Sequence, residues 1–175
     1  MVKAFKYRIY HKKSQQSILN RTLDECRWLY NHLLEQRKTE WEPHQNSLSC
    51  FEQQRTYTIL KTERPSLRDT HSQVLQNVAV RIDLAFQAFF RRVKIGEKPG
   101  YPRFRGKNRY DSVTYPQYGN GAKVNPDGSL QLSKIGCVKM IYHRLIEGIP
   151  KSIAIRRHLP MTRVVDGTHV KVLAW

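Results

Sequence analysis

The sequence predicts an α+β protein, a small β-barrel or twisted antiparallel sheet with a helical bundle inserted after its first strand. Two observations lead to this fold class. In the first half of the chain, apolar residues recur at three- and four-residue steps, which is typical of helices that bury one face. Short runs of alternating apolar and polar residues stand at both ends and predict strands. The first strand needs partners, so we expect it to pair with the carboxyl-terminal strands.

The first strand is predicted at Met1–Tyr10, MVKAFKYRIY. Its residues alternate between an apolar face and a cationic face, Phe5, Tyr7 and Ile9 against Lys6, Arg8 and Tyr10. The first acid in the chain is Asp24, so the cationic face could lie along a phosphate backbone. Lysine on an edge strand also blocks aggregation, and this second explanation of the exposed cations remains open.

Three helices are predicted to follow the first strand. The first begins with Ser14 as its N-cap and continues to Trp41, and residues 43–49 break it. A shorter helix is predicted from Phe51 to Thr62, because Pro65 ends it. The third helix runs from about Ser72 to a stop at Gly96.

The third predicted helix carries an apolar and aromatic stripe that we expect to lie in the core. Its members are Val74, Leu75, Val78, Ile82, Ala85, Phe86, Phe89, Phe90 and Val93. The last turns carry Arg91, Arg92 and Lys94, which favour the negative end of the helix dipole. These cations also lead directly into a basic loop, so a local and a functional role are both open.

Beyond Tyr118, turn residues at Gly119–Gly121 and Pro126–Gly128 separate short alternating runs. The predicted strands are Ala122–Asn125, Ser129–Ser133, Val138–Tyr142, Ser152–Arg156 and His169–Leu173. We therefore divide the chain into four parts: a first strand at 1–12, an inserted helical domain at 13–97, a basic aromatic loop at 98–121 and the remaining strands at 122–175.

The segment from Arg91 to Tyr118 is the strongest functional signal in the chain. Between Arg91 and Arg109 there are eight Lys or Arg residues against one acid, Glu97, so phosphate is the expected counter-charge. The residues predicted to contact phosphates are Lys6, Arg8, Arg91, Arg92, Lys94, Arg103, Arg105, Lys107 and Arg109. Tyr115 and Tyr118 are predicted to stack on unpaired bases. Aromatic residues between Gly and Pro also pin loops to their own domain, and that alternative stays open.

Composition supports a polyanionic partner. The chain has 31 Lys and Arg against 14 acids, a net charge of +17 over 175 residues. Such charge binds nucleic acid by releasing condensed counterions, without reading sequence. A membrane surface is the competing polyanion, but the chain has no apolar run near 20 residues and no signal peptide, so we expect a cytoplasmic protein.

Cysteine and histidine usage predicts neither a metal site nor a cofactor. The three cysteines lack any CxxC spacing, and the seven histidines are scattered along the chain. We therefore expect reduced thiols, no zinc site and no disulfide framework.

Three stretches resemble the TnpB/OrfB family of insertion-sequence transposon proteins, which are relatives of type V CRISPR effector nucleases. They are KAFKYRIYHKKSQQ, LDECRWLYNHLLEQR and GEKPGYPRFRGKNRYDSVTYPQYGNGAKV, and the resemblance runs from Met1 to Arg157. It implies a wedge-like β unit interrupted by a helical recognition domain. It also implies binding of a transposon-end guide RNA and of target DNA beside a short flanking motif, with base pairing supplying most of the specificity.

The family also has a RuvC-like nuclease domain with three carboxylates that hold metal ions, and a zinc ribbon. Neither is found in this sequence, whose acids after Tyr110 are Asp111, Asp127, Glu147 and Asp166. Asp166 is followed by nine residues, too few for a nuclease fold. We therefore expect no catalytic residues and no enzyme activity. After Arg157 the sequence matches the family less well, so we expect this last piece to fold poorly.

Three functional hypotheses follow. The first is a truncated TnpB-like protein that binds guide RNA and target DNA without cleaving, with a full-length relative as a further candidate partner. The second is a fragment of a decayed transposon gene without selected activity. The third is a structural RNA-binding protein of the ribosomal type, suggested by charge alone; the long helices and the family motif count against it.

Overall fold

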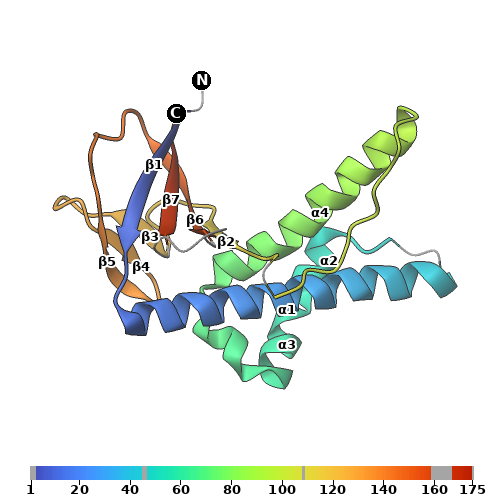
Figure 1. The fold of residues 1–175 in the computed structure, drawn as a ribbon. Coiled ribbons are helices and arrows are strands. Elements are labelled where there is room, and N and C mark those ends of the chain that lie inside the picture. The colour runs from blue at the N-terminus through green and yellow to red at the C-terminus, as the bar shows by residue number, and fades with distance from the viewer. Residues whose placement is uncertain (1–2, 45–46, 108, 159–166, 175) are drawn as a thin grey trace. The chain divides into compact units, whose positions relative to one another are not determined.

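The computed structural model describes residues 3–44, 47–107, 109–158 and 167–174. The elements in chain order are β1 (Lys3–Tyr10), α1 (Lys13–His44), α2 (Cys50–Arg55), α3 (Tyr57–Glu63), the 3-10 helix η1 (Pro65–Asp69), α4 (Ser72–Lys94), β2 (Ser112–Tyr115), β3 (Ala122–Val124), β4 (Leu130–Leu132), β5 (Gly136–Met140), β6 (Pro150–His158) and β7 (Gly167–Ala174), as drawn in Figure 1. The predicted α+β class, with the helices inserted after the first strand of an antiparallel sheet, is confirmed.

Contacts divide the chain into two compact units. The sheet unit comprises residues 1–23 and 111–175, and the helical unit comprises residues 24–110. Helix α1 contributes its first turns to the sheet unit and the rest of its length to the helical unit.

The seven strands form one sheet in the order β2-β6-β7-β1-β5-β4-β3, and every neighbouring pair is antiparallel. Strand β1 lies between β7 and β5, with Phe5 opposite Val172 and Ile9 opposite Met140. The apolar face predicted for this strand is confirmed, because Phe5, Tyr7 and Ile9 are all buried. The alternation of apolar and polar residues in the sequence therefore matches the alternation of buried and more exposed side chains along β1.

Two parts of the sheet differ from the prediction. Residues Ser112–Tyr115, expected in the basic aromatic loop, form strand β2 and pair with Ile153–Arg156 of β6. Strand β7 confirms the strand predicted at His169–Leu173, although it lies in the piece expected to fold poorly; it pairs with both β1 and β6 and buries Val170, Val172 and Ala174. Alternation in this piece is sufficient for a central strand even where the family pattern weakens.

Helix α1 begins one residue before the predicted N-cap, Ser14, and ends at His44. Ser14 therefore lies inside the first turn; the side chain of Gln15, the third helical residue, accepts a hydrogen bond of 3.0 Å from the Lys12 N–H, which is one half of a capping box. The predicted apolar face is buried from Leu19 to Leu34, whereas Ile18 is exposed.

The predicted helix at 51–62 is two helices, α2 and α3. Ser49 and Glu52 form a capping box at the start of α2. At Thr56 the side-chain hydroxyl donates a hydrogen bond of 2.8 Å to the Gln53 carbonyl. A hydroxyl that binds a nearby backbone carbonyl competes with helical hydrogen bonding, and the two helices meet at this residue.

Helix α4 buries its stripe only along part of its length. Val74, Val78, Ile82 and Phe86 are buried, so the core prediction is confirmed over these turns. It is wrong at the carboxyl end, where Phe90 and Val93 are among the exposed apolar residues. In Figure 1 this end of α4 diverges from α1. The helix ends before Gly96, whose φ of 73° is in the left-handed region that glycine adopts without strain.

Candidate nucleic-acid interface

The first candidate surface is the outer face of the sheet around β1 and β7. Lys6 is exposed on this face and lies directly opposite Lys171 of β7. Lys171 in turn lies opposite Ala154 of β6, which lies opposite Thr114 of β2. Two exposed lysines thus stand side by side, next to the shorter side chains of Ala154 and Thr114. We call Lys6, Arg8, Arg156 and Lys171 the sheet cations.

A second row of the same face contains Arg8 and Arg156. Both are placed by register opposite His169 of β7, one from each side. The Arg8 guanidinium lies over the ring of Tyr10 at 5.4 Å from its centroid, and Arg156 Nε donates to Asp111 Oδ2 at 2.8 Å. Arg156 is thus partly neutralised, whereas Lys6, Arg8 and Lys171 take part in no ion pair within the described residues.

The position of β1 removes one of the two explanations for its cations. A lysine that protects a sheet edge has to lie on an outermost strand. Among the described strands the outermost are β2 and β3, whereas β1 and β7 are interior neighbours. The cationic face of β1 is therefore a feature of the middle of the sheet and is not edge protection.

The second candidate surface is the basic segment, residues 91–109, in the helical unit. Arg91, Arg92 and Lys94 occupy the last turns of α4, as predicted from the sequence. Arg103, Arg105, Lys107 and Arg109 are all exposed, and the described residues from 97 to 110 form no helix or strand. None of these seven cations has an acidic partner in the part of the chain that the structure describes. Their charge is therefore available to an external anion.

Asn31 of α1 fixes the path of the basic segment. Its Oδ1 accepts a hydrogen bond of 2.7 Å from the Arg105 N–H, and its Nδ2 donates one of 3.0 Å to the Arg105 carbonyl. The Arg105 guanidinium lies 5.6 Å from the centroid of the Tyr30 ring. Nothing in the sequence marks Asn31, because a single polar residue on a helix is ordinary.

Tyr110 anchors the end of the same segment. It is buried against Tyr30, with ring centroids 6.0 Å apart, and Arg81 lies over its ring at 5.5 Å. Burial raises the pKa of the Tyr110 hydroxyl far above its usual range. At this position the alternative holds, in which an aromatic residue pins a loop to its own domain.

The two tyrosines predicted to stack on bases are less exposed than the cations of residues 103–109. Tyr115 is only 1% exposed, within β2, and so it offers no face to a base; its predicted stacking role does not fit this burial. Tyr118 is half-buried, and its hydroxyl accepts from Val124 N at 3.0 Å and lies 3.3 Å from Val124 O. This pairing fixes the turn before β3 and leaves part of the ring accessible.

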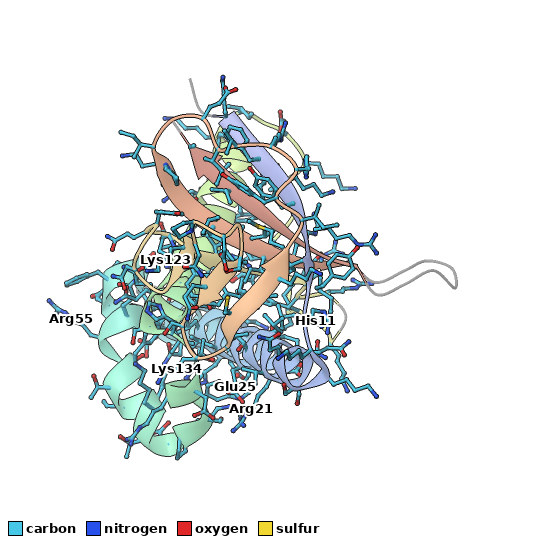
Figure 2. All side chains as sticks on the ribbon, turned by 90° about the vertical axis from the view of Figure 1, so that its left-hand side faces the viewer. His11, Arg21, Glu25, Arg55, Lys123 and Lys134 are labelled. Carbon is cyan, nitrogen blue, oxygen red and sulfur yellow. The ribbon has the colours of Figure 1, made fainter. Side chains whose placement is uncertain are left out.

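Other cations have structural partners and are not candidates. Arg64 donates two hydrogen bonds to the buried carboxylate of Glu25, at 2.6 and 3.0 Å, and stacks on Trp28. The Glu25 contact raises the pKa of Arg64. Lys123 of β3 and Lys134, in the turn before β5, are exposed cations of the sheet unit away from the rows described above (Figure 2).

The described residues contain neither a candidate metal site nor a candidate membrane-spanning helix. They contain no group of three or more His, Cys, Asp or Glu side chains placed to hold a metal ion. Cys26, Cys50 and Cys137 are free thiols, and Asp166 lies outside the described residues. No helix in this part of the chain is long and apolar enough to cross a bilayer.

Comparison with known proteins gives one family model and two curated relatives. The family model HTH_OrfB_IS605, a helix-turn-helix domain, matches residues 1–46. Within that range the described residues, 3–44, form β1 and one continuous helix, α1, and contain no turn between two helices.

The two relatives share sequence over most of this chain. The putative RNA-guided DNA endonuclease InsQ of Escherichia coli (strain K12) is 25% identical over 158 residues, 88% of this chain and 37% of the relative. A putative RNA-guided DNA endonuclease of Streptomyces pristinaespiralis is 31% identical over 134 residues, 75% of this chain and 32% of the relative. The chain thus spans about a third of the length of the curated relatives it matches.

Proposed function

Because the chain belongs to the TnpB/OrfB family of insertion-sequence proteins, we propose that it binds a guide RNA from the transposon end and the DNA that this RNA targets. Both curated relatives are named as RNA-guided DNA endonucleases, which supports nucleic acid as the partner class. Under this proposal the protein works in the cytoplasm, with a full-length relative as a further partner.

The observation that carries the proposal is the set of unpaired cations on the two candidate surfaces. Lys6 and Lys171 face each other in the middle of the sheet with no acid between them. Exposed cations held on strands can contact phosphates and position a nucleic acid without reading its sequence. Base pairing with the guide supplies the sequence information under this proposal.

We further propose that this chain binds nucleic acid without cleaving it. Two-metal cleavage needs clustered carboxylates that are free to hold ions. Asp111 is paired with Arg156 at 2.8 Å, and Glu147 accepts from Lys3 Nζ at 2.6 Å. Asp127 accepts from both the backbone N–H and the hydroxyl of Ser129, which lowers the pKa of its carboxyl group. Each of these three acids, all within the described residues, thus has a local partner.

The test is to sequence the RNA that copurifies with the protein at moderate salt. The wild type is compared with the Arg103→Ala/Arg105→Ala variant and with a control, Lys61→Ala/Arg68→Ala, which removes two cations from α3 and η1 of the same unit. One discrete transposon-end transcript, lost in the first variant and kept in the control, supports the proposal. Heterogeneous RNA that is equally abundant in all three samples contradicts it and favours the decayed-fragment hypothesis.

A further inference from the structure

A cavity of about 250 Å³ in the helical unit is walled mainly by aromatic side chains. Five rings come from α1, α4 and the segment after α4, and they are Trp41, Phe86, Phe89, Phe90 and Tyr101. Ser47 and Leu48 complete the lining, and Arg37, whose side chain is 8% exposed, lies at the base. All of these residues belong to one unit of the chain.

The rings are packed firmly on one side and open on the other. Tyr101 meets Phe86 at a centroid distance of 5.6 Å and an angle of 90°, and Phe89 at 5.5 Å and 78°. These edge-to-face contacts fix the ring positions. Yet Trp41 is 53% exposed, Phe90 55% and Tyr101 46%. Rings that served only the core would be covered, so these leave flat apolar faces for another molecule.

The base of the cavity carries a fixed guanidinium. The Arg37 side chain is 8% exposed, and it donates from Nε to Gln53 Oε1 at 2.8 Å and from Nη2 to Asp83 Oδ1 at 3.1 Å. It also lies over the Phe86 ring at 5.1 Å. No described residue accepts a hydrogen bond from its Nη1. A guanidinium has five N–H donors, so a carbonyl oxygen at the base of the cavity could be bound here.

The charges around the rim select the kind of occupant. Phe90 is followed directly by Arg91 and Arg92, and Tyr101 stands between Lys98 and Arg103. A second copy of this chain, with its net charge of +17, would be repelled. A polyanion that carries flat rings with carbonyl groups matches all three features: the ring faces, the guanidinium and the cationic rim.

We propose that this cavity takes an unpaired nucleobase of a single-stranded nucleic acid. The base stacks on the exposed faces of Trp41 and Tyr101, its carbonyl oxygen accepts from Arg37, and the flanking phosphates lie against the cations after Phe90. The inference rests on the proposed function, since it assumes a nucleic-acid partner, and it adds where an unpaired base binds.

The test separates bases from phosphates. One probe is a fluorescent oligothymidylate, and the other is an oligomer of equal length whose internal residues are abasic, so that both carry the same charge. Fluorescence anisotropy is measured with wild type, Trp41→Ala, Tyr101→Ala and a control, Phe51→Ala. Phe51 is 64% exposed on α2 of the same unit and is not part of the cavity wall.

We expect the wild type and Phe51→Ala to bind the base-containing probe roughly tenfold more tightly than the abasic probe. Trp41→Ala and Tyr101→Ala should lose this difference and bind the abasic probe as the wild type does. A conservative variant gives an independent readout: tryptophan fluorescence should be quenched by the base-containing probe in the wild type and not in Trp41→Phe.

Two results would overturn the inference in different ways. If the wild type binds both probes equally and its fluorescence does not change, the cavity does not take a base, whereas phosphate binding and the proposed function stand. If the wild type binds neither probe at low salt, the proposed function fails together with the inference.

Discussion

Lys6 on β1 lies directly opposite Lys171 on β7, in the middle of the seven-stranded sheet. Like charges directly opposite each other destabilise an antiparallel pair, because their Cβ atoms are only about 5 Å apart. A polyanion that crosses the two strands would neutralise both lysines at once. The pair therefore connects the stability of the sheet to its proposed ligand.

Replacing Lys171 with Glu should separate these two effects. The new carboxylate faces Lys6, so the free energy of unfolding should rise by about 0.2–1 kcal/mol. Nucleic-acid affinity should fall, because a phosphate contact is replaced by repulsion, and the salt dependence of binding should weaken. Urea denaturation and binding titrations at several salt concentrations measure the two quantities on the same protein.

Lys123→Glu is the matched control. It makes the same charge change on β3, where Lys123 lies opposite Gln131 and not opposite a cation (Figure 2). We expect it to change neither stability nor binding as strongly as Lys171→Glu. A Lys171→Glu protein that is less stable than the wild type, or that binds with unchanged affinity, would refute the assignment of this face.

Asn31→Ala tests whether the basic segment has to be held in place. The variant keeps every cation but removes both hydrogen bonds from Asn31 to the Arg105 backbone. Each such bond is worth about 0.5–1.5 kcal/mol, so hydrogen exchange at the Arg105 amide should become faster. Affinity should drop while the slope of log K against log salt stays near that of the wild type.

The double variant Arg103→Ala/Arg105→Ala should behave differently from Asn31→Ala. It removes two charges, and so it should lower the salt slope by about one to two units. Asn120→Ala serves as the control for Asn31→Ala, because among the described residues the Asn120 side chain bonds to Gln117 alone, within a turn of the sheet unit. An Asn31→Ala protein with unchanged exchange and affinity would show that the hydrogen bonds to Arg105 are incidental.

The strand pattern of this fold was readable from the sequence because burial there follows a short period. Phe5, Tyr7 and Ile9 alternate with polar residues, and one face of β1 is buried in the same alternation. Strand β2 has only four residues and follows a loop rich in cations, so its alternation was too short to stand out. Its pairing with β6, about 40 residues later, is a tertiary fact that no local pattern contains.

The site was only partly readable for a similar reason. Charge alone marks a candidate residue, so the sequence predicts Lys6 and the cations of residues 91–109 as phosphate contacts. It does not predict Lys171, because the proposed role of Lys171 depends on its position opposite Lys6. The aromatic ring of Tyr115 predicts stacking, but its burial depends on the alternation of β2. Along α4, periodicity predicts which residues share a face. It does not show where the buried part of that face ends.

Phe86 and Phe90 lie one turn apart on α4 and should differ in their contribution to stability. Phe86 is 9% exposed and Phe90 is 55% exposed, although both belong to the same stripe. Phe86→Ala should lower the free energy of unfolding by about 3–5 kcal/mol, the usual cost of emptying a core site. Phe90→Ala should cost less than about 1 kcal/mol, because little buried area is lost. Thermal and urea unfolding compare the two variants, and equal costs would contradict the observed end of the core.

The cysteines give a prediction about pH. Burial raises the pKa of the Cys26 thiol to about 12, whereas an unfolded cysteine ionises near about 8.5. Between these values the unfolded chain releases a proton that the folded chain keeps, so stability is fully present below about pH 8.5 and falls as pH rises toward 12. The slope should be about 1.4 kcal/mol per pH unit for this one group.

Cys26→Ala should remove that slope. Cys137, exposed on β5, offers the control, since Cys137→Ala should leave the pH dependence of unfolding as it is in the wild type. Urea midpoints are measured between about pH 8 and 9, where tyrosine ionisation in the unfolded chain, with a pKa near about 10, still contributes little. Alkylation gives a second readout: because the thiolate is the reactive form, iodoacetamide should label Cys137 in the folded protein and Cys26 only after unfolding. Rapid labelling of Cys26 under native conditions would show that the core around α1 opens far more often than its burial implies.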